Sequence, residues 1–257
     1  MTRAQSMGKP ATGAAARAKP GVGKSVVGTP IVGKSTVGKP AAAARQGRPK
    51  TANRLKRIEA KHAAILDAAL ALFSRYGLHG TTVEEIARTA GVSKTNLFYY
   101  FASKEDVYVG VLSRLLDLWL EPLREFQLDS DPIEGIREFI RRKMLFSRAH
   151  PEASRLFCLE MVQGAPLLRG ELETSLKALV DSKVPVIEAW VAAGKLAPVD
   201  PHHLIFALWA TTQHYADFAS QIDALLKTGL DDDRFVEEAT RNVQRIVLDG
   251  LRVRNEG

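Results

Sequence analysis

A glycine-rich run near the N-terminus, Gly28–Ser35, has the residue types and spacing of a phosphate-binding P-loop. In such a loop the backbone amides at the start of a helix surround a phosphate, so a strand must precede the run and a helix must follow it. Here Pro40 stops a helix soon after the run, and a ten-residue repeat produces a second Gly-Lys-Ser at 23–25. We therefore expect a chance match rather than a nucleotide site.

A strongly basic segment surrounds this run. Residues 1–58 contain 13 of the 36 lysines and arginines and no acidic residue, which leaves 23 basic and 29 acidic residues for 59–257. The formal net charge of +7 therefore combines a tail of +13 with a body of −6. The tail is rich in Gly and Pro and holds too little apolar surface to offset the entropy of ordering. We predict that residues 1–57 are a disordered basic tail, either simply solvated or attracted to nucleic-acid phosphates without regard to sequence.

Catalytic and metal-binding patterns are missing from the sequence. The single cysteine, Cys158, excludes a disulfide framework and a zinc site made of several thiolates, and the six histidines include no pair at i, i+4. No acid–base pair or nucleophile motif supports an enzyme. No apolar run approaches the length of a membrane span, and no secretory signal is present. We expect a cytoplasmic protein that is not an enzyme, binds no metal or cofactor and does not enter a membrane.

Residues 58–107 have the pattern of three packed helices. An apolar period of 3.6 residues predicts a first helix that ends at Gly77. Thr82 begins a capping box for a short second helix that stops at Gly91, and Ser93 caps a short third helix. Two short helices joined by a tight turn and packed on a longer one form a helix-turn-helix, which is typical of DNA-binding domains.

The third of these helices begins with polar side chains on its outer face. Lysine and asparagine donate to purine edges, and threonine and tyrosine contact backbone oxygens or a thymine methyl group. Any one of these residues alone is equally consistent with capping or a solvated face, but together with the three-helix pattern they favour contact with DNA. The set is Ser93, Lys94, Thr95, Asn96 and Tyr99.

The segment TTVEEIARTAGVSKTNLFYYFASKEDVY (81–108), which follows AILDAALALFSRYG, resembles the DNA-binding domain of the TetR family of bacterial transcriptional repressors. The resemblance implies an all-helical homodimer whose two recognition helices face successive major grooves of a palindromic operator. It places Lys94, Thr95, Asn96 and Tyr99 on recognition-helix positions. It also matches Thr82, Tyr100 and Lys104 to positions that hold or flank phosphate contacts.

Residues 108–257 are predicted to be helical throughout and to form a bundle. Asp131-Pro132 and Asp200-Pro201 each supply a helix cap followed by a first-turn proline. Together with the helix-turn-helix, the bundle gives an all-α protein in which residues 108–257 bind an effector and form the dimer. The expected helices are 104–128, 132–149, 151–163, 171–194, 201–226 and 234–252.

Large apolar residues of this bundle are candidates for a ligand pocket, although a packed core is the simpler interpretation for most of them. Gln213 stands out because it lies one turn after Trp209 on a mostly apolar helix. An amide beside an indole suits a flat amide-like ring such as a nucleobase, but a glutamine at a dimer interface has the same appearance. The run 141–143, Arg-Arg-Lys, is interpreted as a solvated helix face.

The stretches LLDLWLEPLREF, PEASRLFCLEMVQGAPLL and GKLAPVDPHHLIFALWATTQHYADFASQI resemble the pyrimidine-utilisation repressors within the TetR family. This resemblance implies that uracil or thymine is the effector and that it releases the operators of pyrimidine-degradation genes. Two alternatives stay open: a TetR-type regulator for a different small aromatic ligand, and a non-specific DNA-coating protein dominated by its tail. The resemblance matches Trp119, Trp209 and Gln213 to the pyrimidine pocket, with Leu116, Phe157 and Met161 as wall residues.

Overall fold

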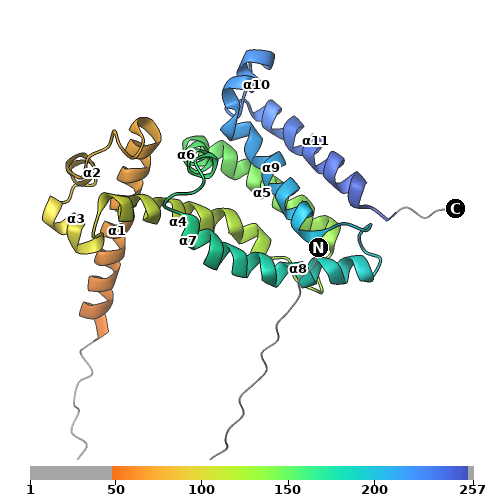
Figure 1. The fold of residues 1–257 in the computed structure, drawn as a ribbon, viewed down its shortest axis with the longest axis horizontal. Coiled ribbons are helices and arrows are strands. Elements are labelled where there is room, and N and C mark those ends of the chain that lie inside the picture. Colours follow the sequence, from red (N-terminus) through yellow and green to blue (C-terminus); the bar gives the residue numbers. More distant parts are fainter. Residues whose placement is uncertain (1–47, 254–257) are drawn as a thin grey trace, which may run out of the picture. The chain divides into compact units, whose positions relative to one another are not determined.

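The structure, a computed structural model, describes residues 48–253, with side chains from Asn53 onward. All regular elements of this range are helices, which confirms the predicted all-α class (Figure 1). The P-loop-like run Gly28–Ser35 and most of the predicted tail lie outside the described residues, so both interpretations stay predictions. In the part of the chain that the structure describes, no helix is long and apolar enough to cross a membrane.

The first helix, α1 (Arg48–Tyr76), begins ten residues before the predicted start at 58. The prediction was wrong because residues 53–57 are exposed on every side and therefore show no apolar stripe, although they are good helix formers. Residues 48–57 thus belong to α1 rather than to the tail. The helix ends as expected at Gly77, whose φ of +70° is the left-handed conformation that favours glycine.

The helix-turn-helix consists of α2 (Val83–Thr89) and α3 (Lys94–Tyr100). The Thr82 hydroxyl accepts from the Glu85 amide at 3.3 Å, and the Glu85 carboxylate accepts from the Thr82 amide at 2.9 Å. The Ser93 hydroxyl accepts from the Asn96 amide at 3.1 Å. Both predicted caps are therefore present, and they fix where each short helix starts. We call α1, α2 and α3 together the reader helices.

Nine further helical elements follow within the described residues, and two of the predicted helices are interrupted. The helix expected at 171–194 contains a single π-helical turn, η1, and the helix expected at 201–226 is divided at Phe218. The first helix of the group ends at Arg124 rather than at 128. The segments are α4 (Lys104–Arg124), α5 (Pro132–Ala149), α6 (Pro151–Val162), α7 (Arg169–Glu171) with η1 (Leu172–Leu176), α8 (Lys177–Ala192), α9 (Pro201–Asp217), α10 (Ala219–Leu226) and α11 (Asp233–Leu251).

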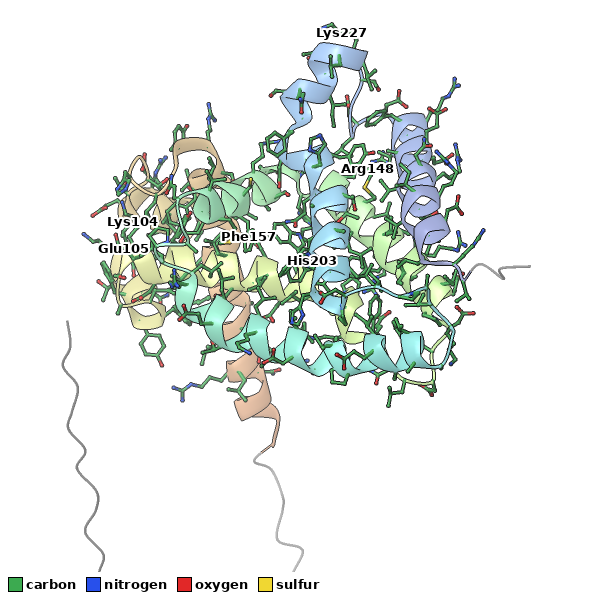
Figure 2. The ribbon with its side chains drawn as sticks, turned by 45° about the vertical axis from the view of Figure 1, so that its right-hand side comes forward. Lys104, Glu105, Arg148, Phe157, His203 and Lys227 are labelled. Atoms are coloured by element: carbon green, nitrogen blue, oxygen red, sulfur yellow. The ribbon has the colours of Figure 1, made fainter. Side chains whose placement is uncertain are left out.

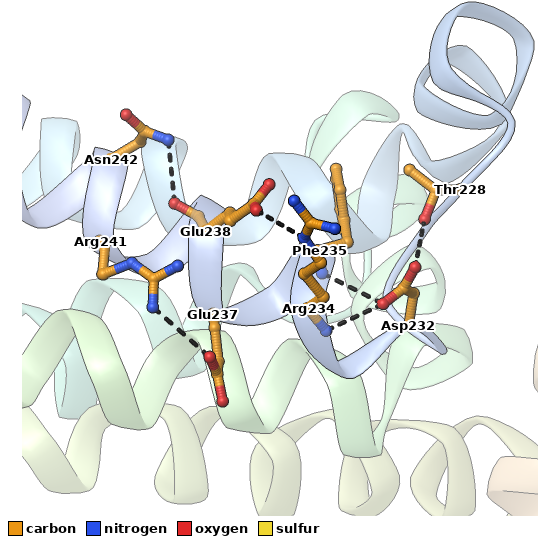
Figure 3. Close-up of polar contacts among 8 residues, drawn as sticks. All are labelled: Thr228, Asp232, Arg234, Phe235, Glu237, Glu238, Arg241 and Asn242. Atoms are coloured by element: carbon orange, nitrogen blue, oxygen red, sulfur yellow. Dashed lines mark hydrogen bonds and ion pairs between the residues drawn. The ribbon is translucent and has the colours of Figure 1, made fainter.

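The start of α11 is held by its capping residue, Asp232 (Figure 3). Its carboxylate accepts from the amides of Arg234 and Phe235 at 2.8 and 3.2 Å and from the Thr228 hydroxyl at 3.2 Å. Exposed i, i+4 ion pairs follow along the outer face of the helix. The inner face packs on α5, so the cap sets the register of α11 on the bundle.

Two large hydrophobic clusters form most of the core of the described residues, and α4 belongs to both; a small third cluster joins α9 to α11. The first cluster joins the reader helices to α4 and α6 without a break, from Leu97 of α3 to Trp119 of α4 and Phe157 of α6. The second joins the end of α4 to α5, α8, α9 and α11 around residues such as Leu123 and Trp190. In Figure 1, α4 runs from the reader helices to the bundle. A displacement of α4 therefore disturbs both cores.

A buried lysine completes the C-terminus of α4. The Lys183 ammonium, which comes from α8, donates to the carbonyl oxygens of Arg124 at 2.9 Å and Phe126 at 3.0 Å. The last carbonyls of a helix have no partner within the helix, and a cation there also meets the negative end of the helix dipole. Lys183 thus ties the end of α4 to α8.

Replacing Lys183 with methionine should lower the free energy of unfolding by about 1–3 kcal/mol, because the two carbonyls lose their donor. The control is Lys177→Met on the same helix, which removes only an exposed ion pair with Asp181 and should change stability by less than about 0.5 kcal/mol. Urea unfolding of the two variants checks this. Equal stability of the two variants would contradict the capping role.

Candidate functional site

The outer face of α3 is accessible to a ligand as large as DNA. Tyr99 is 70% exposed, and Ser93, Lys94 and Thr95 are also exposed. Asn96 is half-buried. Four of the five residues predicted at the start of α3 are therefore accessible, and the contact of all five with DNA stays a prediction.

Several predicted DNA contacts also have partners within the protein. The Lys94 ammonium lies 2.5 Å from a Glu84 carboxylate oxygen of α2, so DNA phosphate would have to replace this carboxylate. Lys104, in the first turn of α4 (Figure 2), donates to the carbonyl oxygen of Thr81 at 3.0 Å. This bond fixes the start of α4 to the residue that precedes the N-cap of α2. Tyr100 is half-buried and packs edge-on against Tyr99, with 5.2 Å between ring centroids.

A cavity of about 230 Å³ lies between α4, α5, α6, η1 and α9. All six residues predicted for a ligand site line it, although they come from three separate helices. The side chains that the sequence predicts for a ligand site therefore share one cavity, and their contact with a ligand stays a prediction. The complete lining is Leu116, Trp119, Leu120, Lys143, Phe157, Met161, Leu172, Leu176, Trp209 and Gln213.

Aromatic contacts hold the Trp119 indole in place. Its ring meets Phe157 of α6 edge-on, with 4.8 Å between centroids and 77° between planes, and meets Phe146 of α5 at 5.5 Å and 83° (Phe157 is labelled in Figure 2). Edge-to-face pairs at this spacing are the favourable arrangement for aromatic rings. Trp119 is only 4% exposed, so it forms a rigid wall of the cavity.

Lys143 of α5 is the most important lining residue that the sequence reasoning missed. The interpretation of residues 141–143 as a solvated face was wrong for this side chain, which is 2% exposed. Its ammonium lies 4.7 Å from the centroid of the Trp119 ring, and it makes no hydrogen bond or ion pair with the residues of 53–253. A signal existed, because Lys143 follows Ile136 by seven residues and Ile140 by three, which places it on the apolar face of the helix.

Burial dominates the charge state of Lys143. Desolvation lowers its pKa from 10.5 to about 7, and the negative charge of Asp217 on α9 partly opposes this effect. Burial also raises the pKa of Asp217, whose carboxylate accepts from the Ser154 hydroxyl at 2.5 Å. The cavity therefore contains an amine that changes charge near neutral pH.

The π-helical turn η1 forms part of the cavity wall. Two of its five residues, Leu172 and Leu176, line the cavity. A π turn shifts the side chains that follow it around the helix, and such turns occur often at functional sites. The sequence of this turn contains no proline or glycine, so the π-helical turn could not be predicted from its own residues.

A buried carboxylate connects the cavity wall to the reader helices. Glu160 of α6 accepts from the amides of Leu167 and Leu168 at 2.8 and 3.1 Å and from the Tyr108 hydroxyl of α4 at 3.3 Å. Burial and the negative charge of Glu160 raise the pKa of Tyr108, so the phenol keeps the proton that it donates. The Tyr108 ring in turn packs edge-on against Phe73 of α1, with 5.2 Å between centroids.

We expect the stability effect of Lys143→Met to depend on pH. Between pH 7 and 10.5 the unfolded chain keeps the lysine proton and the folded protein releases it. The free energy of unfolding of the unmodified protein should therefore rise with pH in this window, by up to about 1.4 kcal/mol per pH unit from this group. The variant removes both the cost of the buried charge and this slope.

Urea unfolding at several pH values checks the prediction. Below pH 7 the Lys143→Met variant should be the more stable protein, and its advantage should shrink as the pH rises to 10. An advantage that is the same at pH 6 and pH 10 would show that Lys143 does not titrate in this range.

Comparison with known proteins agrees with this arrangement. Residues 65–111 match the family described as bacterial regulatory proteins, tetR family, and residues 112–254 match the family described as YcdC-like protein, C-terminal region. The HTH-type transcriptional regulator RutR of Escherichia coli (strain K12) is 54% identical over 210 residues, which cover 81% of this chain and 99% of RutR.

A more distant sequence and a solved structure are also similar to this chain. The HTH-type transcriptional repressor NicS of Pseudomonas putida is 27% identical over 147 residues, which cover 57% of this chain and 68% of NicS. The structure of the fatty acid degradation regulator FadR from Bacillus halodurans matches with a TM-score of 0.60 at 21% identity, over 76% of this chain and 97% of that chain. The chain described here belongs to the TetR family of bacterial regulatory proteins, with a C-terminal region of the YcdC-like type.

Proposed function

We propose that this protein is a cytoplasmic transcriptional repressor that binds a palindromic operator as a homodimer and is released by uracil or thymine. The genes it controls would be those of pyrimidine degradation. The observation that carries the proposal is the cavity, which all six predicted ligand residues line. Its walls α4 and α6 share one hydrophobic cluster with the reader helices. The 54% identity to RutR, named a transcriptional regulator, supports the same function.

The exposed polar face of α3 supports the DNA-binding half of the proposal. In a helix-turn-helix the second short helix enters the major groove and its N-terminal residues reach base edges. The corresponding positions here are Lys94, Thr95 and Asn96, in the first turn of α3. Thr82 and Ser93 serve as caps, and their hydroxyls lie at the two helix starts, where operator phosphates would bind. The basic residues of 1–58 would add attraction that does not depend on sequence.

The dimensions and lining of the cavity support a small planar effector. Its volume of about 230 Å³ falls below the range of about 300–1,000 Å³ that accommodates drug-sized molecules, so a single ring fits better than a long-chain ligand. Trp119 and Trp209 supply flat walls, and the Gln213 amide supplies both a donor and an acceptor. A pyrimidine-dione edge alternates carbonyl and N–H groups and matches such an amide.

The coupling between ligand and DNA runs through α4 and α6. A ligand in the cavity touches Trp119 of α4 and Phe157 of α6. The same α4 is tied to the reader helices by the bond from Lys104 to Thr81, and α6 is tied to α4 by the bond between Tyr108 and Glu160. A ligand that binds better when these helices are displaced would separate the reader helices of the dimer. Moving most of the population requires a preference of about 5 kcal/mol for the state that cannot bind DNA.

Replacing Gln213 with leucine should abolish the response to uracil and leave DNA binding intact, because it removes the amide from the cavity and keeps the residue's size. DNA duplexes selected from a random pool serve as operator, and fluorescence anisotropy measures their release by uracil. The matched control is Gln221→Leu, an exposed position of α10, which should respond like the unmodified protein.

Three results would overturn this account in different ways. Release of the Gln213→Leu variant by uracil would show that the pyrimidine binds elsewhere. A selected duplex that neither uracil nor thymine releases would indicate a different small aromatic effector. Steep salt dependence with no selected sequence would indicate a non-specific DNA-coating protein.

A further inference from the structure

The charge of the effector cavity is concentrated in one side chain. Lys143 is the single ionisable residue among the described residues that line the cavity, and the other lining residues are apolar apart from Gln213. The Lys143 side chain is 98% buried, and its ammonium has no hydrogen-bond partner in the described part of the protein. A buried polar group without a partner is costly, so its donors are available to a molecule that enters the cavity.

The surroundings of Lys143 leave its donors free for a ligand. From α4 it meets the face of Trp119, which attracts a cation without accepting a conventional hydrogen bond. From α9 the charged group that faces it is Asp217, which lies beyond ion-pair distance and is bound by Ser154 and next to Cys158 of α6. The η1 turn brings only leucines to the cavity.

We propose that Lys143 donates a hydrogen bond to the C4 carbonyl of the bound pyrimidine, which cytosine replaces with an amine, and thereby selects uracil and thymine over cytosine. The inference rests on the proposed function and names the residue that determines its specificity. An ammonium group offers three donors and no acceptor. It stabilises a carbonyl oxygen in its reach, and it repels an exocyclic amine, which is itself a donor.

Gln213 cannot make this distinction by itself. Its amide can turn so that either its oxygen or its nitrogen faces the ligand, so it accepts donors and acceptors alike. Trp119 and Trp209 contact ring faces, which uracil and cytosine share. The preference for a carbonyl at one edge of the ring is therefore assigned to Lys143.

The proposal also predicts uptake of a proton when the ligand binds. Burial lowers the pKa of Lys143 to about 7, so at pH 7.5 the Lys143 amine is neutral in a large fraction of the protein molecules. A carbonyl oxygen that accepts from the ammonium favours the charged form and raises this pKa. Binding of uracil at pH 7.5 should therefore take up a fraction of a proton from the buffer.

Isothermal titration calorimetry with uracil and cytosine tests the inference on the unmodified protein and on Lys143→Met. The unmodified protein should bind uracil at least about tenfold more tightly than cytosine, and the variant should lose most of this ratio. Repeating the uracil titration in buffers of different ionisation enthalpy measures the proton uptake, which the variant should not show. The matched control is Lys177→Met, an exposed lysine outside the cavity whose loss should leave stability, the ratio and the uptake unchanged.

The outcomes separate this inference from the proposed function. If the unmodified protein binds uracil and the Lys143→Met variant keeps its preference over cytosine and its proton uptake, the role of Lys143 is wrong and the pyrimidine function stands. A ratio near one in the unmodified protein also overturns the inference. If the folded protein binds no pyrimidine, the proposed function itself fails.

Discussion

The placement of α4 in both hydrophobic clusters is the constraint on which the rest of the structure depends. At one end its side chains pack with the reader helices, and at the other they pack with α5, α8 and α9. Protein interiors are tightly packed and do not deform continuously, so a helix shared by two cores moves as a unit or not at all. Trp119, near the middle of α4, is part of the first core and also part of the cavity wall. A ligand against this indole therefore acts directly on the element that carries the reader helices.

Three buried or partly buried hydrogen bonds tie α4 to its neighbours. Lys104 binds its first turn to Thr81, just before α2, Tyr108 binds it to Glu160 of α6, and Lys183 of α8 caps its last turn. Each of these bonds connects α4 to a different part of the chain, so a shift of α4 would break at least one of them. Lys143 differs from them because it has no protein partner among the described residues and faces the cavity. Hydrogen bonds to protein acceptors thus hold α4 at these three points, whereas the Lys143 ammonium has no such acceptor in the described part of the chain.

The sequence predicted the local features of this fold well. The caps at Thr82 and Ser93 depend only on residues three positions away, and the same holds for the turn at Gly77. The residues of the cavity could be predicted because large apolar side chains and Gln213 recur at helical spacing on segments that resemble a known family. The division of the helix at Phe218 could not be predicted, because no breaking residue occurs there and neighbouring helices determine the backbone path.

The missed features have physical reasons of the same kind. The π turn before α8 depends on packing across the cavity rather than on its own composition. The first turns of α1 have no buried face, so the apolar period that marks a helix is absent from them. The sequence suggests a solvated Lys143 because the two residues before it are arginines, whereas its register with Ile136 and Ile140 places it inside. For a charged residue on a helix, register is a better guide to burial than the charge of adjacent residues.

The most direct test of this account is the thermodynamic linkage between the two sites. Calorimetry gives the uracil dissociation constant with and without saturating operator duplex, and anisotropy gives the operator dissociation constant with and without saturating uracil. If the ligand acts through α4, each ligand weakens the binding of the other, and by the same factor, because coupling free energy is reciprocal. A uracil dissociation constant that is unchanged by the operator would contradict the account, even if uracil binds tightly in the cavity.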